Sequence, residues 1–166
     1  MRFKAELAVE QLQLLHSLIG PISRISPQAI VYLDPEYIRL SSRDGDGISC
    51  FAELKVKGGI FLSHKIESVA DNAIVFEIDL LQWRGAMQSI VGVGERNDGP
   101  HSQHDGVRSG DNQYASHNGS VATTTMKLAK RHGGIACLCV DGKCAGAVVD
   151  VYHAIPIRIM RASDMQ

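Results

Sequence analysis

The spacing of apolar residues predicts a strand and then a helix at the start of the chain. The first seven residues alternate, with Phe3, Ala5 and Leu7 on one face, which is the two-residue period of a half-buried strand. From Val9 the apolar positions recur every three to four residues, as in an amphipathic helix. Pro21 falls inside this pattern. We expect it to weaken or kink the helix, because proline has no N–H to donate.

Three short strands joined by tight turns follow the helix, and the same order then recurs. The strands of the first copy are predicted at residues 29–33, 38–42 and 48–56. After a weak strand at 61–69, the second copy is predicted as a strand at 73–78, a helix at 80–90 and strands at 124–129, 135–140 and 147–151. Two strand–helix–three-strand units without obvious residue identity predict one α+β domain with pseudo-twofold symmetry.

Residues 94–120 match no helix or strand pattern. The segment is rich in Gly, Ser, Asn, Asp and His, and its only large apolar residues are Val107 and Tyr114. Such a segment buries too little apolar surface to offset the entropy of ordering it. We therefore expect a disordered surface insertion at about 94–120, between the second helix and the next strand.

Charge and composition narrow the class of protein. The chain has 17 Lys and Arg against 18 Asp and Glu, a formal net charge of −1, which argues against nucleic-acid binding by bulk attraction alone. No stretch of 18 residues lacks a charged side chain, so a membrane-spanning helix is excluded. Glu6 interrupts the apolar run that a secretory signal would need, and we expect the four cysteines to be reduced thiols.

Two clusters have the residue types of metal sites without their spacing. Asp44, Asp46, Gly47 and Glu53 partly match a calcium-binding loop, but Ser42 stands where its first carboxylate belongs. The flanking residues have strand period, so a hairpin turn is the better interpretation.

The second cluster is a set of cysteines with a histidine nearby. The cluster comprises His132, Cys137, Cys139 and Cys144. Its spacing lacks the two matched ligand pairs of a structural zinc site. Cys137 and Cys139 would share one face of a strand, where buried cysteine packs as a small apolar residue. We therefore expect no metal.

Catalytic signatures are absent from the sequence. It has no phosphate-binding glycine loop, no dinucleotide fingerprint and no Gly-x-Ser-x-Gly elbow. These patterns therefore give no support for an enzyme, and we expect no cofactor.

Six segments, taken in order, resemble the first domain of a DNA sliding clamp. They are MRFKAEL (1–7), the Asp34-Pro35 turn, ISCFAEL (48–54), NAIVFEI (72–78) leading into the Trp83 helix, TMKLAKRH (125–132) and HAIPIRI (153–159). No single motif is specific, and their order and spacing carry the similarity. Within the PCNA-like superfamily, the chain most resembles the Hus-one subunit of the nine-one-one (Rad-nine, Rad-one, Hus-one) checkpoint clamp.

The resemblance implies a PCNA-like α+β domain with its helices on one face of an antiparallel sheet. Residues 1–154 would form the first clamp domain and 155–166 the start of an interdomain connector, with the second clamp domain absent. Such a chain would be a non-catalytic subunit of a nuclear heterotrimer that acts in the DNA-damage checkpoint and repair. Its expected partners are Rad-nine-like and Rad-one-like subunits, an ATP-driven clamp loader and duplex DNA held weakly, by topology.

The resemblance also implies where this chain would meet DNA. Helices line the hole of clamp rings, and the DNA-facing positions here would be His16, Arg24, Arg84 and Gln88. Because few of these side chains are cationic, we expect weak, salt-sensitive contact with DNA. The alternative is an ordinary solvated helix face.

Two further interfaces follow from the same resemblance. Rings close by pairing of edge strands, and the candidate edge is residues 147–153, with interface positions Ala147, Val149, Val151 and His153. An ordinary edge strand blunted by Asp150 is an equal alternative. A pocket for partner peptides would use Leu40, Ile157 and Ile159.

Two other function classes remain open from the sequence. A replication clamp of the PCNA family would form a homotrimer, which size and partner dependence would distinguish from a heterotrimer. A small α+β binding module or enzyme unrelated to clamps would carry a concave polar site and need no subunit partner.

Overall fold

A computed structural model gives the fold of the chain and describes residues 1–43, 45–69, 72–95, 121–144 and 150–161. Most of the predicted insertion at 94–120 lies outside the described residues. The same holds for Ala147, Val149 and the end of the expected connector at 162–166.

The order of elements follows the predicted doubled plan. The first copy comprises β1 (Arg2–Leu7), α1 (Val9–Ile25), β2 (Gln28–Leu33), β3 (Tyr37–Arg43) and β4 (Ser49–Lys55). The extra strand β5 (Ser63–Glu67) stands between the copies. The second copy comprises β6 (Ile74–Asp79), α2 (Leu80–Glu95), β7 (Val121–Lys130), β8 (Ala136–Cys144) and β9 (Val151–Met160).

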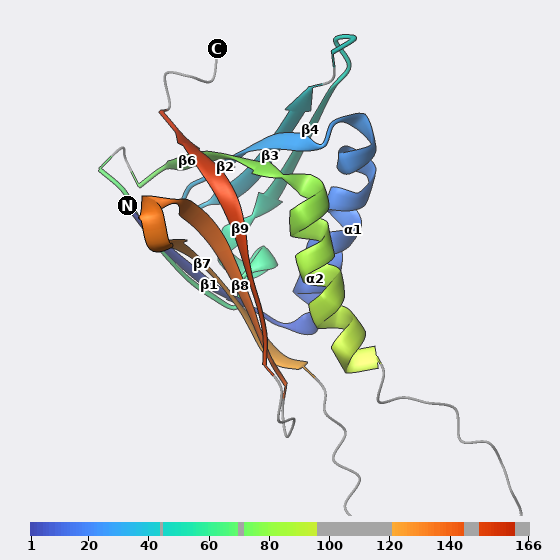
Figure 1. Cartoon of the computed structure of the whole chain (residues 1–166), viewed down its shortest axis with the longest axis vertical. Helices are drawn as coiled ribbons and strands as arrows, with labels where there is room; N and C mark the ends of the chain where they lie inside the picture. Colours follow the sequence, from blue (N-terminus) through green and yellow to red (C-terminus); the bar gives the residue numbers. More distant parts are fainter. Residues whose placement is uncertain (44, 70–71, 96–120, 145–149, 162–166) are drawn as a thin grey trace, which may run out of the picture.

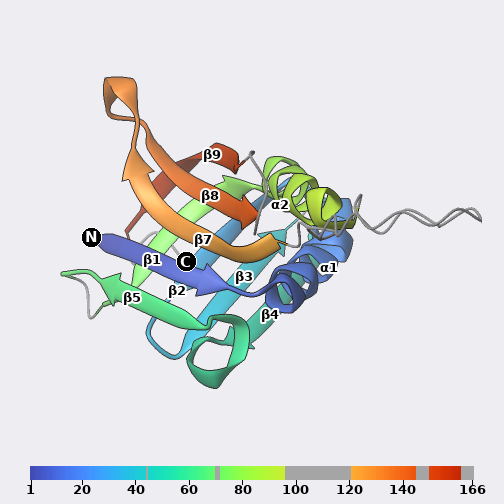
Figure 2. The same cartoon turned by 90° about the horizontal axis from the view of Figure 1, so that it is seen from below.

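The strands form one antiparallel sheet in the order β4-β3-β2-β6-β9-β8-β7-β1-β5. The first strand of each copy pairs with the other copy, since β1 pairs with β7 and β6 pairs with β2. This exchange gives the domain its pseudo-twofold character. The sheet curves, and α1 and α2 lie side by side against its concave face (Figures 1 and 2).

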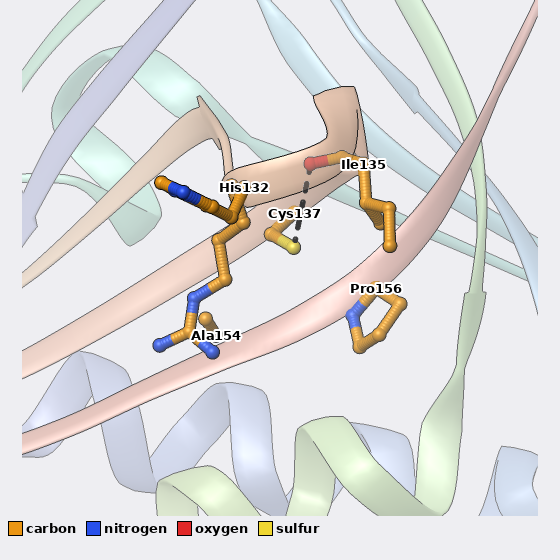
Figure 3. Close-up of a pocket in the computed structure, with 6 residues that line it drawn as sticks. His132, Ile135, Cys137, Ala154 and Pro156 are labelled. Atoms are coloured by element: carbon orange, nitrogen blue, oxygen red, sulfur yellow. Dashed lines mark hydrogen bonds between the residues drawn. The ribbon is translucent and has the colours of Figure 1, made fainter.

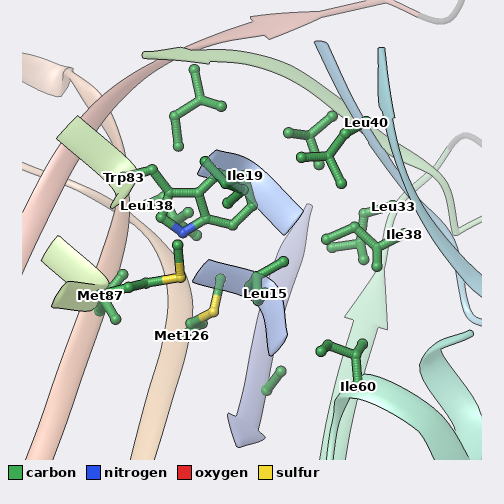
Figure 4. Close-up of a cluster of buried hydrophobic side chains, with 14 of the residues drawn as sticks. Leu15, Ile19, Leu33, Ile38, Leu40, Ile60, Trp83, Met87, Met126 and Leu138 are labelled. Carbon is green, nitrogen blue, oxygen red and sulfur yellow. The ribbon is translucent and has the colours of Figure 1, made fainter. Parts of the chain in front are cut away.

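One continuous apolar core lies between the helices and the sheet. Helix α1 contributes the stripe that the sequence predicted, comprising Leu12, Leu15, Ile19 and Ile22. Trp83 of α2 is fully buried among side chains that include Ile19 and Leu138 (Figure 4). Burial of each large apolar side chain contributes about 1.5–3 kcal/mol, so this core fixes both helices on the sheet.

Helix α1 continues through Pro21 and ends at Ile25. Proline at this position removes the hydrogen bond to the carbonyl of Ser17, four residues earlier. Ser17 and Pro21 are both exposed, so water can satisfy that carbonyl. Proline is therefore tolerated on the solvent side of the helix.

The Asp34-Pro35 turn between β2 and β3 is built by the side chain of Asp34. Its Oδ1 accepts hydrogen bonds from the backbone N–H groups of Glu36 and Tyr37, each at 2.7 Å. The β3–β4 register pairs Arg43 with Ser49, so the segment with partial calcium-loop spacing is a hairpin connection, as the strand period predicted.

Candidate subunit and DNA interfaces

The four helix residues with an expected DNA-facing role lie on α1 and α2, and they differ in exposure. Arg24 and Gln88 are exposed, whereas His16 and Arg84 are half-buried. Glu10 in the first turn of α1 is exposed too. The helix pair therefore presents few net positive charges to solvent.

His16 and Arg84 belong to the contact between the two helices. A Cβ placed on Gly20 of α1 would lie 3.9 Å from Nε of Arg84, so the guanidinium packs over the turn that carries His16 and Gly20. Burial, and after it the positive charge of Arg84, lowers the pKa of His16. His16 is therefore uncharged at neutral pH, which leaves Arg24 and Arg84 as the cations among the four positions.

The strand expected at 147–151 begins later and runs further than the sequence indicated. Strand β9 spans Val151–Met160 and lies between β8 and β6 in the strand order. In its described part the expected edge strand is paired on one side, where Val151 pairs with Gly142 and His153 with Val140 of β8. Its role in a subunit interface stays a prediction.

The two neighbours of β9 occupy different halves of it. Residues 151–156 pair with β8, and residues 157–160 pair with β6. Pro156 lies at the change of partner, where a missing N–H is tolerated. On the side that faces away from β8, residues 151–156 pair with none of the described strands. The backbone of this half of β9 is therefore an open edge with respect to the described strands.

The side chain of His153 points toward the helices rather than along that edge. Its Nε2 lies 2.5 Å from Oγ of Ser89 on α2, and the Ser89 hydroxyl donates to the carbonyl of Ala86 at 2.9 Å. His153 therefore donates from Nε2 to Ser89 and ties β9 to α2.

The residues expected to form a pocket for partner peptides lie in two different places in the structure. Leu40 is fully buried in the core, so its assignment to a surface pocket is wrong. An alternating strand puts every second residue inside, and Leu40 falls on the inner side of β3. Ile157 and Ile159 do line one hollow of about 260 Å³, together with Met1, Leu128 and Ala136.

Cys137 and Cys139 of β8 pack as the sequence predicted. Cys137 and Cys139 are both buried and share one face of the strand. The hydroxyl of Tyr152 donates to Sγ of Cys139 at 3.0 Å, and this bond is the largest cause of a raised pKa for Tyr152. Within the described part of the chain, no three His, Cys, Asp or Glu side chains are placed to hold a metal ion.

Sequence reasoning missed a row of lysines on the outer face of the sheet. Lys4 of β1 pairs directly with Lys65 of β5 on one side and with Lys127 of β7 on the other. The alternation of β1 would have placed Lys4 outside, but only strand pairing brings the other two lysines beside it.

No helix in the described residues is long and apolar enough to cross a membrane.

Comparison with known proteins gives concordant matches. The family model described as Hus1-like protein matches residues 1–166. A curated relative, "Checkpoint protein hus1 homolog" of Dictyostelium discoideum, is 31% identical over 96 residues, which are 57% of this chain and 34% of the relative. The chain thus spans about a third of that relative's length.

The fold has a solved counterpart. The crystal structure of PCNA from Thermococcus kodakaraensis matches with a TM-score of 0.52 and 13% identity, covering 96% of this chain and 47% of that one. This likeness establishes the PCNA-like clamp fold. Because the family model covers the full sequence, the chain belongs to the Hus1-like protein family, the Hus-one family that its segments resemble.

Proposed function

We propose that this chain is a non-catalytic subunit of a heterotrimeric DNA sliding clamp that acts in the DNA-damage checkpoint and repair. The observation that carries the proposal is the match of the Hus1-like family model to residues 1–166, on a chain with the clamp fold. The Dictyostelium relative is named as a checkpoint protein, which supports the same role. The proposed location is the nucleus.

The helix pair would face the hole of the ring and the DNA inside it. Arg24 and Arg84 are the cations available there, and Gln88 adds an exposed amide. Each phosphate contact that a cation makes adds to the salt dependence of binding. Two cations give a shallow dependence, so the ring would hold DNA by enclosure rather than by affinity.

The open half of β9 offers a route to ring closure. The backbone N–H and C=O groups of residues 151–155 that point to this side would pair with a strand of a neighbouring subunit. The partners we propose are Rad-nine-like and Rad-one-like subunits, with a clamp loader to open the ring. Because β9 continues to Met160, we extend the first clamp domain to that residue and place the connector after it.

Co-expression with Rad-nine-like and Rad-one-like subunits of the same organism tests this function. Tyr152 on β9 is 48% exposed, and Tyr152→Lys would place a charge beside the incoming strand. We expect this variant to reduce co-purification at least tenfold, whereas Leu62→Lys, at a 58% exposed site outside β9, retains it. Equal recovery of both variants would reject ring closure through β9.

The same experiment separates the PCNA-like alternative. A homotrimeric replication clamp would assemble from this chain alone, with a mass three times that of one chain. A heterotrimer would form only when the other two subunits are present.

A further inference from the structure

The outer face of the sheet, away from the helices, carries cations in register on three adjacent strands. Lys65, Lys4 and Lys127 stand directly opposite one another on β5, β1 and β7. Their neighbours Phe3 and Ala5 are buried in the core, which fixes the lysines on the outer side. We call these three residues the lysine row.

Like charges directly opposite one another destabilise a sheet, and the lysine row is only weakly compensated. Lys4 lies 3.5 Å from a carboxylate oxygen of Glu6, and Lys65 lies 3.0 Å from one of Glu67. Both pairs are exposed, and exposed ion pairs contribute about 0–1 kcal/mol. Within the described part of the chain, Lys127 has no carboxylate within salt-bridge distance. The row therefore keeps an unneutralised positive charge.

An apolar hollow continues from the lysine row along the same register. Lys127 pairs with Cys139, and Cys139 pairs with Ala154. Beside them a hollow of about 550 Å³ is lined by Ile135, Cys137, Ala154 and Pro156, with Arg131 and His132 (Figure 3). A second hollow of about 290 Å³ lies at the lysine row itself.

The walls of the apolar hollow are fixed in place. The β7–β8 turn is closed by hydrogen bonds of 2.9 Å from Gly134 N–H to the carbonyl of Arg131 and from Arg131 N–H to the carbonyl of Ile135. Gly133 and Gly134 take φ values of 81° and 78°, which favour glycine. The Arg131 guanidinium lies 5.7 Å from the ring centre of Tyr152. The hollow is therefore preformed, which lowers the entropic cost of binding.

We propose that this outer face binds an extended acidic–apolar peptide segment of a partner protein. Its acidic residues would lie over the lysine row, and an apolar side chain would enter the hollow between Ile135 and Pro156. From Lys65 to Ala154 is four strand spacings, about 19 Å, which about six extended residues span. Nucleic acid fits less well, because its phosphate backbone has no group for the apolar half. The surface lies entirely within this chain and does not depend on the proposed ring.

The test measures fluorescence anisotropy with the whole chain and a fluorescein-labelled octapeptide. The peptide has three glutamates, three glycines, a leucine and a phenylalanine in this order, and a second peptide has the reverse order. Lys4→Glu with Lys127→Glu should weaken binding at least tenfold. The charge-matched control, Arg43→Glu with Lys55→Glu, alters exposed residues of β3 and β4 at the other end of the sheet and should change binding less than twofold.

The apolar half is tested separately. Ile135→Ser should weaken binding at least fivefold, while Leu14→Ser, at an equally exposed site on α1, should have no effect. Circular dichroism confirms folding of each variant. Three results would each overturn the proposal. The first is that neither peptide order binds, and the second is that a peptide with lysines in place of the glutamates binds equally well. The third is that the lysine variants weaken binding of a duplex oligonucleotide but not of the peptide.

Discussion

Burial and the neighbouring positive charge of Arg84 together hold the pKa of His16 below its ordinary value of 6.5. The two residues belong to different helices, and the Arg84 guanidinium lies against the α1 turn at Gly20, where a Cβ would be 3.9 Å from its Nε. The charge that the helix pair presents is therefore set by contact between the helices as well as by composition.

Arg84→Gln should raise the pKa of His16, because it removes the repulsion that disfavours the imidazolium. The shift should be partial, since burial, the larger cause, remains. NMR titration of the His16 imidazole measures it. Arg24→Gln is the matched control and should leave this pKa unchanged.

His16 also gives the fold a pH dependence of known sign. Below pH 6.5 the unfolded chain protonates His16 before the folded chain does, so stability falls as pH drops through that value. Urea unfolding between about pH 7.5 and about pH 5.5 should show a smaller loss for His16→Gln than for the original chain. An equal loss in both proteins would remove His16 as a cause.

The bond between Ser89 and His153 should be measurable as a coupling between α2 and β9. Ser89→Ala and His153→Ala should each destabilise the fold by about 1 kcal/mol, the net contribution of one hydrogen bond. The double variant should lose less than the sum, because both changes remove the same bond. Additive losses in chemical denaturation would contradict the contact.

Gly142 of β8 should not tolerate a side chain, because a Cβ there would lie 2.6 Å from Cγ2 of Ile90 on α2. Gly142→Ala should cost about 1–3 kcal/mol through overpacking. Gly85→Ala on the same helix meets no atom within 4 Å and should be neutral or stabilise by up to about 1 kcal/mol. Thermal unfolding of the two variants tests the contrast.

Local pattern was enough for most of the fold, because burial alternates every two residues in strands and every three to four in helices. It failed at β9. There the strand begins at Val151 and changes partner at Pro156, and both features depend on the neighbouring strands. Placing Leu40 in a pocket was wrong for a related reason, since which face of β3 is buried is decided by the helices.

The interfaces depended even more on tertiary structure. The sequence identified cations on α1 and α2, but His16 and Arg84 come into contact only when the two helices pack together. The lysine row is hidden in the sequence because Lys4, Lys65 and Lys127 are far apart along the chain and meet only through strand register.

Native mass spectrometry of this chain co-expressed with Rad-nine-like and Rad-one-like subunits tests the central claim most directly. A clamp subunit of the proposed kind gives a complex with one copy of each of the three chains. A complex of three copies of this chain, or a chain that stays alone when both partners are present, would contradict the account.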